Sequence, residues 1–243
     1  MSVKIVWGMV AYGPFPYAPV YTSHMRAIAY AARTLAVEFR DGSTIVGAGS
    51  SDRMYTHAAE NQIVEDFLAI PDATHLFMTE MDMILPDDII PKLLALDAPA
   101  ASGVYFLRKG RGQACLYKKT VTPANNPYPF TPVSIFPTTK PFRLKNGCPG
   151  LGCVLIRRDV FEKLERPWFD LKEKNPRTGE GYGSDMYFWT NVGRAGFDVW
   201  VDPTADCNQI DYEIYSIMDY YQRLREDPPF AERGYIIGAT EHA

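Results

Sequence analysis

The chain has 243 residues, of which 47% are hydrophobic and 22% are charged, and its formal net charge is −4 at pH 7. This composition is that of an ordinary globular protein, and the acidic balance argues against a nucleic-acid binder or a protein of anionic membrane surfaces. We expect no membrane span and no signal peptide. The four cysteines show no C-x-x-C spacing, which predicts reduced thiols and a cytoplasmic protein.

The first part of the chain alternates predicted strands and helices. Val3–Val10 is rich in β-forming residues and predicts a strand, followed by a turn-forming loop that contains Tyr12. A helix is predicted over Tyr21–Leu35, with Thr22 or Ser23 as its cap. Its apolar positions recur at helical spacing, namely Met25, Ile28, Ala29, Ala32 and Leu35. Two extended runs follow, over residues 36–40 and 44–48.

A second helix is predicted over residues 56–70, and a short buried strand, Leu76–Met78, follows it. The helix pattern predicts one apolar and one polar face. Expected to be buried are Ala59, Ile63, Phe67 and Leu68, and expected to be exposed are Glu60, Gln62, Glu65 and Asp66.

The acid pair Glu80 and Asp82, directly after that strand, predicts a metal site. Two acids one residue apart lie on the same side of an extended chain, so their oxygens can converge on one hard cation such as Mg²⁺ or Mn²⁺. Another helix (88–96) and strand (99–107) follow, and this alternation predicts a mainly parallel α/β sheet. Ligands of such sheets bind beyond the carboxyl ends of the strands, where this pair is expected to lie.

The second half of the chain is less regular. Six prolines predict an irregular, substrate-covering stretch over 108–148, apart from a short strand at 133–136. Asp185 is predicted to lie in the first turn of a helix, where the helix dipole lowers its pKa. The other elements expected here are the strand Cys153–Ile156, a helix after Asp159, the helix Ser184–Ala195, the strand Phe197–Val201 and a helix near Tyr212–Arg225, with Trp168 and Phe169 in the core.

Four ordered blocks resemble GT-A-type glycosyltransferases, close to family 2 and its short bacterial and phage-type members. The blocks are Ala59-Glu60-Asn61, Leu76–Pro86, Gly150–Phe161, and Ser184–Phe188 followed by Ala195–Pro203. The resemblance implies one α/β domain with a Rossmann-like, mainly parallel sheet flanked by helices. It also implies a nucleotide-sugar and metal half over 1–107 and an acceptor half over 108–243.

The resemblance implies a glycosyltransferase that moves a sugar from a nucleotide sugar, a UDP- or GDP-sugar, to the hydroxyl of a carbohydrate or other acceptor. It implies Mn²⁺ or Mg²⁺ held by Glu80, Asp82 and Gln209, which would offset charge on the departing diphosphate. Asp185 would take the proton of the acceptor hydroxyl. The implied nucleotide-sugar-binding residues are Tyr12, Asp52, Arg53, Asn61, Glu80, Asp82, Arg108, Gly150 and Gly152.

Three positions depart from the family pattern. Glu60 stands where an arginine is common, Glu80 replaces the first aspartate of the D-x-D block, and Gln209 stands where a histidine completes the metal site. The first and third departures keep open a non-catalytic relative that binds sugar or a protein partner.

The residues themselves also leave alternatives open. The alternative role of Asp185 is that of a helix-capping or first-turn acid, and the alternative for Gly150 and Gly152 is a tight turn. A sugar-1-phosphate nucleotidyltransferase is the other enzyme class considered. It would carry a Gly-rich basic loop near the N-terminus, whereas the loop after the first strand reads Tyr12-Gly13-Pro14-Phe15-Pro16.

Overall fold

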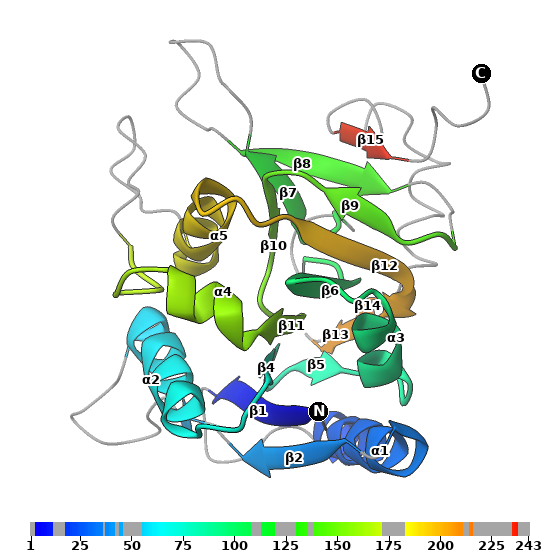
Figure 1. Cartoon of the computed structure of the whole chain (residues 1–243). Helices are drawn as coiled ribbons and strands as arrows, with labels where there is room; N and C mark the ends of the chain where they lie inside the picture. Colours follow the sequence, from blue (N-terminus) through cyan, green and yellow to red (C-terminus); the bar gives the residue numbers. More distant parts are fainter. Residues whose placement is uncertain are drawn as a thin grey trace, which may run out of the picture.

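A twisted central sheet forms the middle layer of the structure (Figure 1). The computed structural model describes residues 3–11, 18–35, 37–41, 44–45, 55–107, 113–119, 130–135, 139–171, 183–210, 214–215 and 235–237. The strands of this sheet are β1 (Lys4–Ala11), β2 (Glu38–Asp41), β3 (Thr44–Ile45), β4 (His75–Glu80), β6 (Ala100–Val104), β9 (Phe142–Leu144), β11 (Cys153–Arg157) and β12 (Val199–Asp206).

The strand order is β2-β1-β4-β11-β6-β12-β9, with β3 also paired to β1. Strands β2, β3 and β4 run parallel to β1, and β12 runs parallel to β6. Strand β11 is inserted between β4 and β6 and runs antiparallel to both, and β9 is antiparallel to β12. The predicted mainly parallel α/β sheet is therefore confirmed.

Helices cover both faces of the sheet because successive strand residues point to opposite sides. Ile5 and Trp7 of β1 pack with the residues of α1 (Ala18–Leu35) and α3 (Ile89–Ala95). Val6 and Val10 belong to the core cluster on the other face. The helices of that face are α2 (Thr56–Ala69), α4 (Arg158–Lys163) and α5 (Ser184–Arg194).

Two smaller sheets extend the central one. The first pairs β5 (Met83–Ile84) with β13 (Asn208–Ile210), which in turn pairs with β14 (Ile214–Tyr215). The second has the order β10-β7-β8-β15. Its strands are β7 (Leu116–Lys119), β8 (Phe130–Ile135), β10 (Gly147–Pro149) and β15 (Tyr235–Ile237).

Several sequence predictions need correction. The stretch 108–148 was predicted to be irregular apart from a strand at 133–136, which is present as part of β8, but β7, β9 and β10 were not predicted. The helix predicted near 212–225 is a strand where it is described, at 214–215. Helix α1 begins at Ala18, before the predicted caps Thr22 and Ser23.

The predicted apolar face of α1 is wrong. On α2 the predicted buried positions Ala59, Ile63 and Phe67 are confirmed, and the prediction for Glu60 is wrong. On α1, Met25 and Leu35 are exposed, and the buried residues are Val20, Ser23, His24, Ala27 and Ala31. On α2, Glu60 is buried instead of exposed, because it lies beside Ile63 and Val64 on the side that faces the sheet. The predicted core positions Trp168 and Phe169 are both buried, as expected.

In the described part of the chain, no helix combines the length and apolar character needed to cross a membrane. Each of the four cysteines is a buried free thiol.

Candidate functional site

The candidate site lies at the carboxyl end of β4, where the chain turns from Glu80 into β5. The register pairs Val10, near the end of β1, with Glu80, and the Met81 N–H donates to the Val10 carbonyl at 3.3 Å. The neighbouring parallel strands β1 and β4 therefore end together, and both acids lie where ligands of such sheets bind.

Asp82 and Gln209 meet in this turn although 127 residues separate them. Gln209 of β13 pairs with Met83 of β5, and the Ile210 N–H donates to the Asp82 carbonyl at 2.7 Å. Gln209 Nε2 donates to Asp82 Oδ2 at 3.2 Å, and both residues are buried, with 5% and 6% exposure. The predicted proximity of these two residues is therefore seen, while their role as metal ligands stays a prediction.

The donor set suits a hard cation. Glu80, Asp82 and Gln209 offer two carboxylates and one amide, all of them oxygen donors of the type that Mg²⁺ and Mn²⁺ accept. As placed, the amide nitrogen of Gln209 faces Asp82, so this side chain orients the carboxylate. A half-turn of the amide would present its oxygen instead. The described residues contain no group of three His, Cys, Asp or Glu side chains able to hold a metal ion.

Glu60 is a site residue that the sequence prediction missed. Helix α2 holds it at 4% exposure, with a hydrogen bond to Ser184. Its Oε2 atom is buried and has no hydrogen-bond partner among the residues that the structure describes. Burial raises the pKa of Glu60 well above its ordinary value, and the nearby charges of Asp185 and Glu80 raise it further. The sequence signal was its place in the wide apolar stripe of Ala59, Ile63, Val64 and Phe67.

Asp185 lies in the first turn of α5, as predicted, next to Ser184. Its Oδ1 accepts the Met186 N–H at 2.8 Å, and the N-cap is Gly183, not the predicted Ser184. A Cβ atom at Gly183 would lie 2.3 Å from Asp185 Oδ1, so the glycine leaves room for this carboxylate. The predicted lowering of the Asp185 pKa is wrong, because burial raises it despite the hydrogen bond from Met186. A raised pKa makes Asp185 a better proton acceptor.

The buried side chains of Tyr105 and Cys115 and the half-buried Tyr117 form a polar wall beside these acids, which the sequence analysis also missed. The Tyr105 hydroxyl accepts the Gly152 N–H at 3.2 Å and is hydrogen-bonded to Cys115. Burial raises the pKa of Cys115 to about 12 and the pKa values of both tyrosines, and the negative charge of Asp185 adds to the rise at Cys115 and Tyr117. All three groups therefore stay protonated at neutral pH.

Gly150 and Gly152, predicted to admit a substrate or a tight turn, lie against this wall. A Cβ atom at Gly150 would lie 1.9 Å from the Tyr105 hydroxyl, and one at Gly152 would lie 2.9 Å from the Tyr105 ring. Thr79 of β4 also donates to the Gly152 carbonyl at 2.9 Å. The glycines therefore let the chain between β10 and β11 pass close to Tyr105, and contact with a substrate stays a prediction.

Asn61 has a structural task in the described part of the chain. Its amide nitrogen donates to the carbonyls of His57 and Phe169, at 2.7 and 2.8 Å. Its oxygen accepts the N–H groups of Trp168 and Phe169, at 3.0 and 3.2 Å. Its side-chain nitrogen and oxygen thus hold the 168–169 turn against α2, and its predicted contact with a nucleotide sugar stays a prediction.

Four other predicted donor-binding residues, Tyr12, Asp52, Arg53 and Arg108, lie outside the residues that the structure describes.

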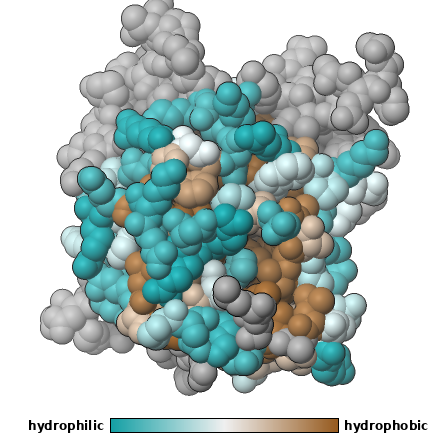
Figure 2. Space-filling view, viewed as in Figure 1, coloured by the Kyte–Doolittle hydropathy of each residue, from teal (hydrophilic) through white to brown (hydrophobic). Residues whose placement is uncertain are grey.

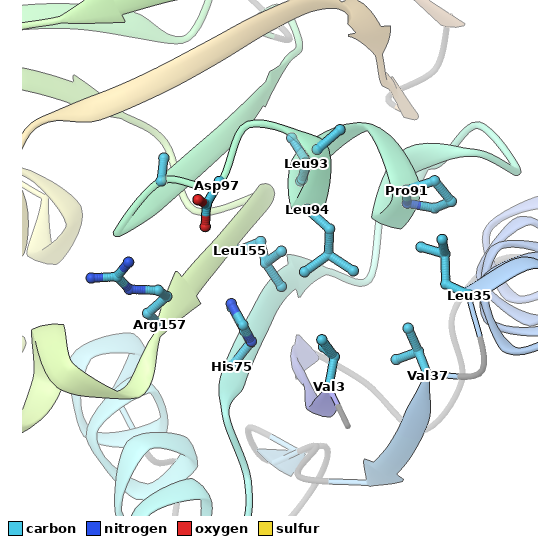
Figure 3. A pocket seen from close by; sticks show the side chains of 12 residues that line it. Val3, Leu35, Val37, His75, Pro91, Leu93, Leu94, Asp97, Leu155 and Arg157 are labelled. Carbon is cyan, nitrogen blue, oxygen red and sulfur yellow. The ribbon is translucent and has the colours of Figure 1, made fainter. Parts of the chain in front are cut away.

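A cavity of about 400 Å³ lies elsewhere, beside α3 and the start of β4 (Figure 3). Its lining is mostly apolar and includes Val3, Leu35, Val37 and Leu94, and none of the site residues above lines it. Arg157, at its edge, is paired with Asp159. The candidate site is therefore the Glu80–Asp82 turn, where Gln209 bonds to Asp82, and not this cavity.

Comparison with known proteins was made at the level of sequence and of structure. No family model and no curated protein matches the sequence. Among solved structures, the chain is similar to A197 from STIV, with a TM-score of 0.57, 15% identity and coverage of 99% of this chain and 100% of that chain. This likeness and the sheet described above confirm the predicted GT-A-like fold.

Two more distant similarities involve glycosyltransferases. GalNAc-T7 with UDP, GalNAc and Mn²⁺ has a TM-score of 0.47 and 11% identity, over 92% of this chain and 48% of that chain. A glycosyltransferase involved in the glycosylation of the major capsid of PBCV-1 has a TM-score of 0.34 and 11% identity, over 69% of each chain.

Proposed function

We propose that this protein is a glycosyltransferase that uses a nucleotide sugar, a UDP- or GDP-sugar, and a divalent cation to glycosylate the hydroxyl of a carbohydrate or other acceptor. The observation that carries the proposal is the placement of Glu80 and Asp82 at the carboxyl end of β4 in a GT-A-like sheet, with Gln209 bonded to Asp82. The charges of Glu80 and Asp185 both act on the buried Glu60, so these groups lie near one another. Structural likeness supports the fold alone, so the chemistry is argued from these side chains.

Each side chain has a distinct task in the proposed reaction. Asp185 accepts the proton of the acceptor hydroxyl, while the oxygen of that hydroxyl forms the new bond to the anomeric carbon. The bond from that carbon to the phosphate oxygen breaks, and the nucleoside diphosphate leaves with the electron pair. Mn²⁺ or Mg²⁺, held by Glu80, Asp82 and the amide oxygen of Gln209, would offset the charge of the diphosphate.

The protonation states of the neighbouring groups suit this reaction. Tyr105 and Cys115 stay neutral, so they add no negative charge near the departing diphosphate. Burial raises the pKa of Asp185, which brings this pKa closer to the pH at which a general base works best. Glu60, which is protonated more readily still, is placed to hold Ser184 at the start of α5.

Calorimetric titration with UDP and GDP tests the proposal. We expect binding in the presence of Mn²⁺ and a loss of roughly tenfold or more in affinity when a chelator removes the metal. Asp82→Asn should weaken binding in the same way, because it removes one charged ligand. Asp87→Asn is the matched control, since Asp87 pairs with Arg26 at the surface and should bind as the wild type does.

The outcomes separate the candidate functions. Equal affinity with and without metal would remove the cation from the mechanism. No binding of either nucleotide would refute use of these donors and leave a non-catalytic sugar- or partner-binding protein as the better description. The observed bond from Gln209 to Asp82 favours keeping that second candidate, because it already engages one carboxylate oxygen.

A further inference from the structure

Helix α1 carries an exposed apolar stripe in addition to its buried face. Tyr21, Met25 and Leu35 are 57%, 42% and 46% exposed, Ala32 is exposed and Ile28 is half-buried. The core of the protein is contacted by a different face, which carries Val20, His24, Ala27 and Ala31. We name the five residues Tyr21, Met25, Ile28, Ala32 and Leu35 the α1 seam.

The spacing of the α1 seam fits another helix. Its members follow one another at intervals of four, three, four and three residues, which is the repeat of a coiled-coil contact line. Such a line is a narrow stripe, whereas a helix lying in a membrane surface exposes a broad apolar face. The seam also carries no charge, so a partner helix would bury no unpaired ion.

We propose that the α1 seam packs antiparallel against the same seam of a second copy of this chain, about a two-fold axis near Ile28. The seam is close to self-complementary about that residue, since Tyr21 and Leu35 lie seven residues from it on either side and Met25 and Ala32 lie three and four residues from it. Tyr21 of each copy faces Leu35 of the other, Met25 faces Ala32, and the two Ile28 side chains meet. A large side chain thus faces a small one beside the axis, as interdigitating helices require.

The charges around the seam agree with a protein partner. Helix α1 has no acidic residue, and its arginines Arg26 and Arg33 lie outside the seam. Arg26 is paired with Asp87 at 2.8 Å, and Arg33 donates to the Ala29 carbonyl at 3.2 Å. With Arg26 neutralised and a net charge of −4, the protein offers little attraction to an anionic lipid surface.

The cavity described above extends the surface at one end. Leu35 belongs to the seam and also lines the cavity, whose lining includes Val3 and Val37 (Figure 3). Hydrophobic side chains gather in the region between α1 and α3 in Figure 2. A stable interface buries about 800 Å² per partner, more than one helical stripe supplies, so the cavity adds needed area. The antiparallel arrangement brings the exposed Tyr21 ring of the second copy to this cavity, where an aromatic anchor is most effective.

Sedimentation velocity at roughly 1–100 µM protein, a range set by the affinity of an interface of this class, measures the association. We expect the wild type to be a dimer and Met25→Glu to be a monomer with unchanged far-UV circular dichroism, because the new charge would be buried against the second copy. Thr34→Glu is the matched control, since Thr34 is exposed on α1 outside the seam, and it should stay dimeric.

Oxidative cross-linking tests the position of the axis. All four native cysteines are buried, so Ile28→Cys adds one accessible thiol, which should form a disulfide with itself across the axis. Thr34→Cys should give no cross-linked dimer. A monomeric wild type at every concentration, or a Met25→Glu variant that remains dimeric, would overturn the proposal. So would a monomer that sediments with phosphatidylserine-containing vesicles, which would assign the seam to a membrane.

Discussion

Glu60 and Asp185 show how the site depends on burial more than on sequence spacing. Ser184 connects the two acids, because it is hydrogen-bonded to Glu60 and immediately precedes Asp185 in the chain. Both pKa values are raised, and in each the loss of water around the carboxylate is the largest cause. The charge of Asp185 also disfavours the ionised form of Glu60 and raises its pKa.

Asp185→Asn should lower turnover by roughly 10²–10⁴-fold, because the amide cannot accept the proton of the acceptor. The Asn oxygen can still accept the Met186 N–H, so stability and nucleoside diphosphate affinity should remain those of the wild type. Steady-state transfer assays and calorimetry measure the two quantities. Asp66→Asn, the same change at an exposed position of α2, is the control. Unchanged turnover in Asp185→Asn would return this residue to a structural role.

Single-residue patterns predicted part of this site. The resemblance to GT-A-type glycosyltransferases implies that Asp82 and Gln209 belong to one site, and the structure brings them together. The burial of Glu60 was not predicted, because a charged residue in a helix is normally assigned to the solvent side. The wall of Tyr105 and Cys115 was missed for a different reason, since the chain between β6 and β7 carries no motif.

At the scale of elements, the segment between β10 and β11 is built around Tyr105. Gly150 donates its N–H to the Cys115 carbonyl at 3.0 Å, and Gly152 donates to the Tyr105 hydroxyl. These bonds fix the segment against β7 and the end of β6, so the backbone there has little room to shift.

Gly150→Ala should lower the free energy of unfolding by about 1–3 kcal/mol, because the new methyl group would overlap the Tyr105 hydroxyl. Urea denaturation measures the effect. Gly193→Ala in α5 is the matched control, since its Cβ would lie 3.4 Å from its nearest neighbour, Asn146 Oδ1. That control should be neutral or stabilising by about 0.5–1 kcal/mol, as alanine favours a helix. Equal stability of both variants would show that the segment can relax away from Tyr105.

The prolines of 108–148 explain why most of its strands were not predicted. Pro132 lies inside β8 and faces Tyr117 of β7, while β15 pairs with β8 only over residues 133–135. The missing N–H of Pro132 therefore falls beyond the β15 pairing, where a strand tolerates proline. Local helical spacing likewise misled the prediction at Ile214–Tyr215, because pairing with β13 decides the structure there.

At the scale of the whole molecule, buried ionisable groups set opposing pH dependences. His24 is buried between α1 and β5, where its Nε2 donates to the Met83 carbonyl at 3.0 Å, and burial lowers its pKa to about 4. As the pH falls below about 6.5, His24 therefore takes up a proton in the unfolded chain but not in the folded protein. Glu60 behaves in the opposite way, since the folded protein binds its proton more readily.

We expect the difference in free energy of unfolding between the wild type and His24→Gln to change with pH. From pH 6.5 to pH 5 the wild type should lose about 1.5 kcal/mol relative to the variant, because His24 takes up a proton in the unfolded wild-type chain and glutamine cannot. Relative to Glu60→Gln, the free energy of unfolding of the wild type should rise from pH 6.5 to pH 5. The reason is that the folded protein disfavours the ionised Glu60 carboxylate, which is populated at the higher pH. Chemical denaturation of the three proteins at both pH values measures these differences. Parallel pH profiles would show that neither group changes its pKa on folding.

The position of β11 has a consequence for synthesis of the chain on the ribosome. Strands β4 and β6 leave the ribosome first, yet they do not touch as neighbours, since β11 occupies the gap between them and begins only at Cys153. Until then the middle of the sheet has two open strand edges, which are prone to pair with other chains. Gln209 emerges later still, so its bond to the Asp82 carboxylate forms only after β11 has been synthesised and can close these edges.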